Sequence, residues 1–319
     1  MSPSSLAVQP IPAPHPGAQA AVAVAPRRDD PLRAVGLLMS AMILFSCSDA
    51  TAKYLAATLP PIEVVWLRYL GFSLLVLPAV VAAGRPGVVL RSRRPGLQLL
   101  RGLGILGSAI IFTAALQWLP MADATATSFV SPIFITALSI PVLGESVGLR
   151  RWAAVGVGLI GVLIVVRPGS EGFQPAMLLP ILSAMSWACG IVLTRKMSGA
   201  DNTITTLAYS GFSGLVVMTL LVPFYWEAPS WHQVLLGLLI GLVSTTAQWI
   251  VVMAYRYADA SVLAPFSYTQ LVWSVLLGFL IFGAIPDTLT FLGAGIIIAS
   301  GLYTAHRERV RAQQARHAG

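Results

Sequence analysis

The chain has 319 residues, of which 56% are hydrophobic and only 10% are charged, and its mean hydropathy is +0.80. Ordinary soluble domains carry about 25% charged residues, so this composition excludes a soluble domain and predicts an integral membrane protein. The net charge of +8 does not indicate nucleic-acid binding. The Lys and Arg residues stand in short clusters between apolar runs, where membrane topology accounts for them.

Residues 1–33 come first and are rich in Pro and Ala. They contain no cation before Arg27, whereas a signal peptide carries its positive charge ahead of its apolar stretch. We therefore expect a disordered cytoplasmic tail.

Ten apolar segments follow that suit membrane-spanning helices, which need about 20 mostly apolar residues. They are 34–57, 62–83, 97–118, 122–143, 152–167, 175–195, 204–224, 232–255, 260–282 and 287–305. Breaks rich in Pro, Gly or charge separate them, for example GRPGVVLRSRRPG and FGAIPD. The fold class predicted is an all-α polytopic membrane protein.

The distribution of cations predicts the orientation of these spans. If the amino terminus is cytoplasmic, nearly all Lys and Arg fall in the tails and in the loops on that side, with Arg101 counted in the second loop. Only Lys53, Arg68 and Arg167 remain for the helices or the outer side. Both termini are therefore expected in the cytoplasm, with residues 306–319 as a basic tail.

The two halves of the chain resemble each other. AALQWLPMADATATSFVSPIF (114–134) aligns with MAYRYADASVLAPFSYTQLVW (253–273) at an offset of 139 residues. In a separate alignment, FSCSDATAK (45–53) lies over WACGIVLTR (187–195), which pairs Cys47 with Cys189 in the first helix of each half. Each half has five spans, and an odd number places the second half upside down. Inverted repeats, here 34–168 and 174–305, recur in secondary transporters, whose substrate site lies between the repeats near the bilayer midplane.

The chain resembles the drug/metabolite transporter superfamily, specifically proteins with two EamA domains. ALQWLPMADATATSFVSPIF and LGESVGLRRWAAVGVGLIGV carry the resemblance in the first half, and AYRYADASVLAPFSYTQLVWSVLLG and FGAIPDTLTFLGAGIIIASGLY carry it in the second. The resemblance implies a ten-helix carrier with a central cavity that opens alternately to each side. Glu145 matches a glutamate of this family, but its counterpart is Ala284. Glu145 has two interpretations: a structural or coupling role, or local pairing with Arg150 or Arg151.

Four ionisable residues interrupt the apolar run FSCSDATAKYLAATLPPIEVVWLRY (45–69). Asp49 lies roughly 22 Å along the first span, Lys53 follows one turn later, and Arg68 lies roughly 9 Å into the returning second span. Glu63 falls at the outer rim. Charges within a membrane face the bundle interior and have partners. One interpretation is an ion-pair network that locks two helices; the other is a substrate-binding or gating cluster.

The second half has no acid at the position that corresponds to Asp49 and contributes amphipathic residues instead. Trp187, Tyr268, Gln270 and Trp273 suit a cavity for a partly flat, partly polar solute, although any single aromatic also fits the lipid face. Pro132 and Pro265 are expected to kink their helices. Small-residue segments such as 156–161 and 293–301 are expected to pack within the bundle, with a homodimer interface as the alternative.

Catalytic and cofactor motifs are missing from the sequence. It has no P-loop and no H-E-x-x-H sequence, and its four histidines are scattered in tails and loops. We expect no enzyme, no cofactor and no metal site. A non-transporting membrane scaffold or receptor is the alternative from another class.

The sequence favours a secondary transporter of a small organic metabolite in a bacterial-type inner membrane, with a proton as the candidate coupling ion. A zwitterion would satisfy both charge signs of the cluster, so export of amino-acid-like solutes is the first expectation. A vitamin- or nucleoside-like uptake carrier is the alternative.

Overall fold

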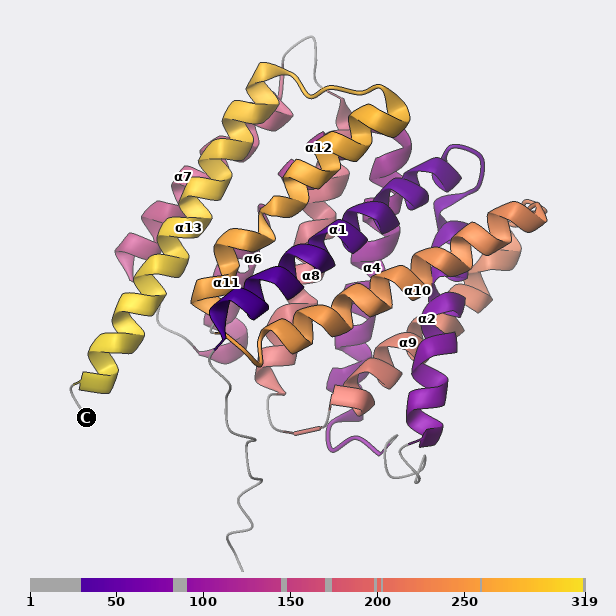
Figure 1. Ribbon diagram of the computed structural model, residues 1–319, viewed down its shortest axis with the longest axis horizontal. Helices are drawn as coiled ribbons and strands as arrows, with labels where there is room; N and C mark the ends of the chain where they lie inside the picture. The colour runs from indigo at the N-terminus through magenta and orange to yellow at the C-terminus, as the bar shows by residue number, and fades with distance from the viewer. Residues whose placement is uncertain are drawn as a thin grey trace, which may run out of the picture.

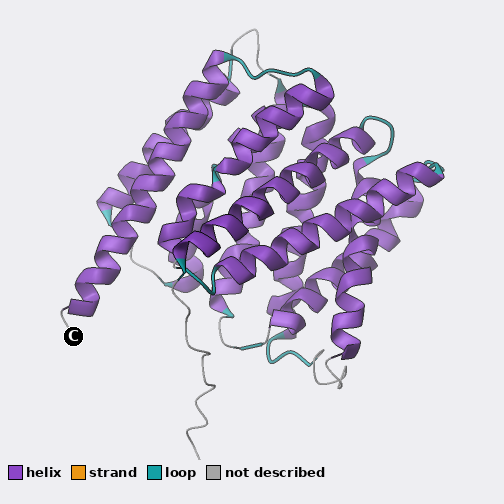
Figure 2. Cartoon of the chain, in the orientation of Figure 1, coloured by secondary structure: helices purple, strands orange, loops and turns teal. Residues whose placement is uncertain are grey.

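The computed structural model describes residues 30–82, 91–144, 148–169, 174–197, 200–201, 203–258 and 260–317. Every regular element in these ranges is a helix (Figure 2). The helices are α1 (Pro31–Ala56), α2 (Pro61–Ala82), α4 (Pro95–Trp118), α5 (Met121–Ser128), α6 (Ser131–Leu143), α7 (Leu149–Val166), α8 (Leu178–Lys196), α9 (Thr203–Leu221), α10 (Trp231–Ala254), α11 (Ala260–Ser267), α12 (Thr269–Phe282) and α13 (Thr288–His317). Two short 3₁₀ turns, Pro175–Met177 and Val222–Phe224, complete the described elements.

Eight of the helical segments in these ranges are long and apolar enough to cross a membrane, and Trp152–Val166 and Thr288–Tyr303 form shorter apolar helices. Large apolar side chains such as Leu77, Val81 and Leu280 are more than half exposed on the outside of the bundle. In water such a surface would be costly, whereas lipid tails match it. The expectation of an all-helical membrane protein is confirmed.

Two of the spanning segments are broken near their middles. α5 ends at Ser128 and α6 begins at Ser131, with Pro132 in its first turn, where a missing backbone N–H costs nothing. α11 ends at Ser267, two residues after Pro265, and α12 begins at Thr269. The breaks therefore accompany both prolines that were expected to kink their helices.

Packing partners are exchanged between the two halves. α1 packs against α10, and the corresponding helices α8 and α4 pack against each other. α1 also contacts α12, as α8 contacts α6, so that α1 lies between α10 and α12 in Figure 1. α7 and α13, the last helices of the two halves, run side by side along one edge of the bundle. Such exchange is expected when a two-fold relation connects two repeats.

Glycine allows α7 and α13 to pack closely. A Cβ atom added at Gly161 would lie 2.8 Å from the carbonyl oxygen of Gly293, and one added at Gly293 would lie 2.6 Å from the carbonyl oxygen of Gly161. These two small-residue segments therefore pack against each other within the bundle, as expected from the sequence.

The boundaries differ from expectation at both ends of the chain. α1 begins at Pro31, ahead of the expected residue 34, and the Asp30 carboxylate accepts a bond from the Arg33 N–H at its start. α13 runs to His317, through the segment expected to be a basic tail. Residues 302–317 contain no Gly or Pro that would stop a helix. Residues 1–29 of the expected disordered tail, and Glu145, lie outside the described residues.

Candidate functional site

Asp49 lies on α1 and is buried, with 8% of its surface exposed. Gln270, in the first turn of α12, donates its Nε2 hydrogen to Asp49 Oδ2 at 3.3 Å. Nearly one turn earlier on α1, the Ser46 hydroxyl donates to the backbone oxygen of Gln270 at 3.2 Å. Two residues expected at the site, one from each half, are thus in contact beside a helix break.

Lys53, one turn beyond Asp49, bonds to backbone oxygens. Its Nζ donates to the carbonyl oxygen of Leu116 at 2.8 Å and to that of Leu119 at 2.7 Å, near the end of α4. The Leu116 carbonyl needs an outside donor, because Pro120 has no N–H to offer it. The Nζ atom also lies 5.5 Å from the centroid of the Phe282 ring.

The ion-pair network considered from the sequence therefore does not include a pair between Asp49 and Lys53. No ion pair joins them in the part of the chain that the structure describes, because the carbonyl groups at the end of α4 occupy the ammonium group. Lys53 ties α1 to α4, and the Gln117 Nε2–H bond to the Ala56 carbonyl at 2.8 Å adds a second tie between the same helix ends.

Arg68 projects from α2 and is half-buried. Within the described ranges its guanidinium group forms no hydrogen bond and no ion pair, although it lies near enough for its charge to act on Asp49. Asp49 and Arg68 are therefore membrane-embedded charges of opposite sign, and neither has an ion-pair partner among the residues that the structure describes. Such charges are costly, and a solute bearing both signs would compensate both.

The aromatic residues expected at the site take separate positions. Tyr268 stands between α11 and α12, and its ring meets Phe129, between α5 and α6, edge to face with centroids 5.0 Å apart. Trp273 packs against an apolar cluster that includes Met42 and Leu263. Trp187 is half-buried on α8.

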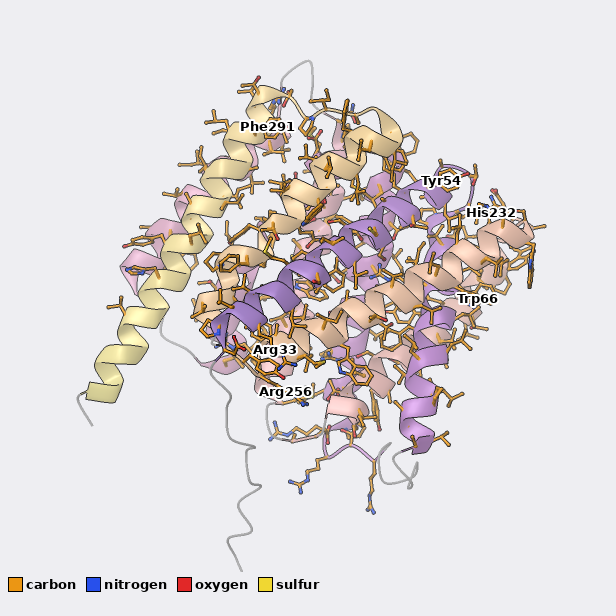
Figure 3. All side chains as sticks on the ribbon, in the orientation of Figure 1. Arg33, Tyr54, Trp66, His232, Arg256 and Phe291 are labelled. Atoms are coloured by element: carbon orange, nitrogen blue, oxygen red, sulfur yellow. The ribbon has the colours of Figure 1, made fainter. Side chains whose placement is uncertain are left out.

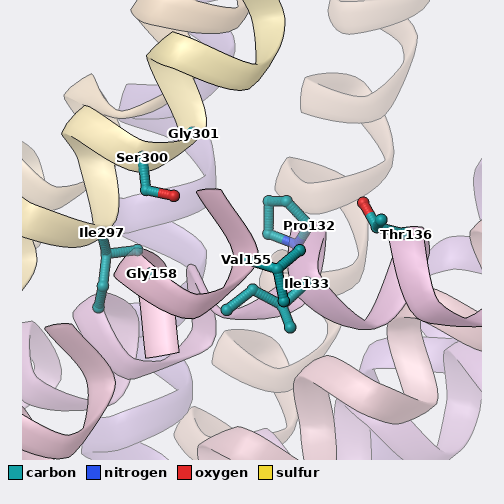
Figure 4. A pocket seen from close by; sticks show the side chains of 8 residues that line it. All are labelled: Pro132, Ile133, Thr136, Val155, Gly158, Ile297, Ser300 and Gly301. Atoms are coloured by element: carbon teal, nitrogen blue, oxygen red, sulfur yellow. The ribbon is translucent and has the colours of Figure 1, made fainter. Parts of the chain in front are cut away.

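A small hollow of about 30 Å³ lies between α6, α7 and α13 (Figure 4). It is lined by Pro132, Ile133, Thr136, Val155, Gly158, Ile297, Ser300 and Gly301. Metabolite sites usually enclose about 300 Å³ or more, whereas this space suits one or two waters. The helices must therefore separate before a metabolite can enter this region.

Two arginines mark one end of the bundle. Figure 3 shows Arg33 and Arg256 together at one end, and Tyr54 and His232 at the other. The Arg33 guanidinium lies 4.7 Å from the centroid of the Tyr257 ring, which joins the start of α1 to the end of α10. The cationic end is the one that the sequence predicts to be cytoplasmic.

Arg101 was missed as a buried residue. It had been counted in a loop, yet it lies inside α4 with 9% of its surface exposed. Its guanidinium donates to Thr194 Oγ1 at 2.7 Å, to the Thr206 carbonyl oxygen at 3.3 Å, and to the Ser210 hydroxyl. The predicted span 97–118 already contained Arg101, so its position within a helix was available from the sequence even though the count of cations assigned it to the second loop.

An ion pair between Arg167 and Asp287 joins the end of α7 to the start of α13. Asp287 also accepts a bond from the Thr290 N–H at 2.8 Å. The hydrogen bond from Arg167 is the main reason why the pKa of Asp287 falls to about 2. The sequence predicts Arg167 in a helix or on the outer side. The pair places it where α7 ends and α13 begins.

Comparisons with known proteins show which protein family the chain matches. Residues 32–167 and 174–304 each match the EamA-like transporter family. A protein called S-adenosylmethionine uptake transporter, from Rickettsia conorii, is 31% identical over 278 residues, which are 87% of this chain and 94% of that protein. A riboflavin transporter from Rhizobium johnstonii is 31% identical over 303 residues, covering 92% of this chain and 97% of that protein. One crystal structure, 21% identical, covers 87% of this chain and 98% of its own with a TM-score of 0.61, which shows the fold alone.

Proposed function

Because the chain belongs to the EamA-like transporter family, we propose that it is a secondary carrier that takes up a small organic metabolite by alternating access. It is a multi-pass protein of the bacterial inner membrane. The expected export of amino-acid-like solutes finds no support among its relatives. Carriers named for S-adenosylmethionine uptake and for riboflavin agree better with the vitamin- or nucleoside-like alternative.

The proposed substrate is of the S-adenosylmethionine type. The observation that carries this choice is the pair of opposite charges, Asp49 and Arg68, neither of which has an ion-pair partner in the described chain. S-adenosylmethionine carries a sulfonium and an ammonium group, which suit Asp49, and a carboxylate, which suits Arg68. Gln270 adds an amide beside Asp49 that is suited to the polar edge of a nucleoside.

The carrier architecture proposed is ten membrane helices in two inverted repeats, 34–168 and 174–305, with both termini in the cytoplasm. The exchanged packing of α1 with α10 and of α8 with α4 supports the repeat. Arg33 and Arg256 at one end support the orientation. In this arrangement Lys53 closes the outer side by holding α1 to α4.

The remaining residues that the sequence places at the site have the following roles in this proposal. Tyr268 and Trp273, with Trp187 across the bundle, would supply apolar surface for the flat part of the solute. Pro132 and Pro265 would hold the helix breaks, and Glu145 would have a structural or coupling role. A proton remains the candidate coupling ion, since Asp49 is a carboxylate within a spanning helix.

An uptake assay in intact bacterial cells tests the proposal. Cells expressing the carrier should accumulate radiolabelled S-adenosylmethionine, and Asp49→Asn and Arg68→Gln should each reduce uptake about 10- to 100-fold, the value of one charge-assisted hydrogen bond. Arg256→Gln is the matched control, because it removes an exposed arginine at the end of the bundle. It should leave uptake unchanged. Uptake that survives both charge changes would remove Asp49 and Arg68 from the site.

Riboflavin is the second candidate substrate. The edge-to-face contact of Tyr268 with Phe129 favours it, because a flat heterocycle can pack against the aromatic surface that these two rings form together. Riboflavin has no charged group to pair with Asp49 or Arg68. Uptake of riboflavin but not of S-adenosylmethionine, insensitive to Arg68→Gln, would establish this candidate.

A further inference from the structure

Two arginines lie at matching depths from opposite ends of the bundle. α2 starts at Pro61 near the end that carries Tyr54, and α4 starts at Pro95 near the other end. Arg68 and Arg101 each lie about two turns into their helix, roughly 10 Å deep at 1.5 Å per residue. One arginine thus belongs to the outer half of the carrier and the other to the cytoplasmic half.

The two arginines occupy corresponding helix interfaces. The repeat offset of 139 residues relates Gly102 of α4 to Gly241 of α10. A Cβ atom at Gly102 would lie 3.5 Å from the Cα of Ser210 on α9, and one at Gly241 would overlap the backbone oxygen of Arg68 on α2. Each interface contains one arginine: Arg101 in the first and Arg68 in the second.

Arg101 is satisfied by neutral partners alone. Its guanidinium bonds to the hydroxyl groups of Thr194 and Ser210 and to the backbone oxygen of Thr206, and no carboxylate pairs with it in the described part of the chain. The neighbouring carboxylate, Asp201, is occupied by Ser92, Gln98 and the backbone N–H of Arg93. A carboxylate offers an opposite charge and two oxygens that match the planar guanidinium fork, which hydroxyl and carbonyl oxygens do not, so a carboxylate would displace these partners.

Tyr69 connects the surroundings of the two arginines. It is buried, with 7% of its surface exposed, and packs against Leu106 and Met218. Both Arg68 and Arg101 lie near enough for their charges to act on it. Tyr69 thus lies within reach of the charges of both arginines, in one cluster formed by α2, α4 and α9.

We propose that Arg101 is a second carboxylate-binding residue, which takes over the carboxylate of the substrate from Arg68 when the cytoplasmic side opens. The proposal rests on the proposed function, since it assumes a substrate with a carboxylate. Opening separates α4 from α8 and α9, which breaks the bonds to Thr194, Thr206 and Ser210 and leaves the guanidinium facing the solute. The bonds from Arg101 to these neutral partners hold α4 against α8 and α9 only until a carboxylate competes for the guanidinium.

Membrane vesicles of both orientations test this exchange. The probes are radiolabelled S-adenosylmethionine and two unlabelled competitors, S-adenosylmethionine itself and its decarboxylated form. In the unaltered carrier, the form without a carboxylate should compete about tenfold less well on either face. Arg101→Gln should abolish this difference on the cytoplasmic face and preserve it on the outer face. Arg68→Gln should do the reverse.

Control variants separate binding from structural support. Ser210→Ala keeps the arginine and removes one neutral partner, so the cytoplasmic difference should persist. Where Arg101→Gln does not fold, Arg101→Lys keeps the charge but not the planar fork, and should reduce the difference on the cytoplasmic face alone. Equal effects on both faces, or none, overturn the role of Arg101 while the proposed function stands. An unaltered carrier that does not transport S-adenosylmethionine overturns both.

Discussion

Phe129 and Tyr268 are related by the 139-residue repeat offset, and their rings touch each other edge to face with centroids 5.0 Å apart. Two equivalent residues meet only where the axis that relates the halves passes between them. Phe129 lies between α5 and α6, and Tyr268 lies between α11 and α12, so the two helix breaks also meet there. Relative rocking of the repeats would move this point least, which makes it the natural pivot of the proposed motion.

The contact of Tyr268 with α13 gives a first prediction. A Cβ atom at Gly301 would overlap the Tyr268 hydroxyl, so Gly301→Ala should destabilise the protein by about 1–3 kcal/mol and slow transport. Tyr268→Phe removes the overlapping oxygen and should restore part of both losses in the double variant. Thermal unfolding in detergent and uptake rates measure the effects. Gly295→Ala on the same helix is the control, because a Cβ atom there meets nothing within 4 Å. No restoration in the double variant would contradict the contact.

A second prediction concerns the separate roles of Lys53 and Asp49. Lys53→Gln should lower the free energy of unfolding by about 1–3 kcal/mol, because the carbonyl groups of Leu116 and Leu119 lose their donor. Lys196→Gln, which removes an exposed lysine at the end of α8, should have little effect.

The same variants test whether Lys53 and Asp49 act independently. The two residues lie one turn apart but have separate hydrogen-bond partners, so the effects of Lys53→Gln and Asp49→Asn on stability should add to within about 1 kcal/mol. A double-mutant cycle read by unfolding in detergent checks this. A coupling well above that value would show that the two charges do interact.

A third prediction follows from the contact between α2 and α10. A Cβ atom at Gly241 would overlap the Arg68 backbone oxygen and lie 2.6 Å from the backbone nitrogen of Phe72. Backbone cannot yield as a side chain can, so Gly241→Ala should cost about 3 kcal/mol or more, at the upper end for overpacking. Gly36→Ala, which meets nothing within 4 Å, is the matched control. Yield of folded protein and its unfolding temperature measure the effect, and an unfolding temperature like that of the control would contradict the close approach.

The helices could be predicted because their signals are local. Apolar runs bounded by Pro, Gly or charge locate the segments, and the offset between the halves points to both helix breaks. The partners of Lys53 could not be predicted in this way. They are backbone oxygens of α4, one of them freed by Pro120, and only the folded bundle brings them within reach of α1.

The burial of Arg101 could not be predicted from the sequence for a related reason. A rule that counts cations near helix ends does not distinguish an arginine in a loop from one two turns into α4. The hydroxyl groups that satisfy it come from α8 and α9, about a hundred residues away in the sequence. The direction of transport could not be predicted from the sequence either, because the charges of Asp49 and Arg68 suit a solute that arrives from either side.

The pair of Arg167 and Asp287 gives a prediction on pH. The bond from Arg167 lowers the pKa of Asp287 to about 2, so its contribution to stability is complete above the unfolded pKa of about 3.9 and is lost as the pH falls through about 2. The Asp287 side chain is 51% exposed, and solvent screening limits the contribution to about 0.5 kcal/mol. The difference in unfolding free energy between the unaltered protein and Asp287→Asn should therefore be constant above about pH 5 and shrink below it. Arg167→Gln should remove the same increment, and a difference that grows on acidification would contradict the pair.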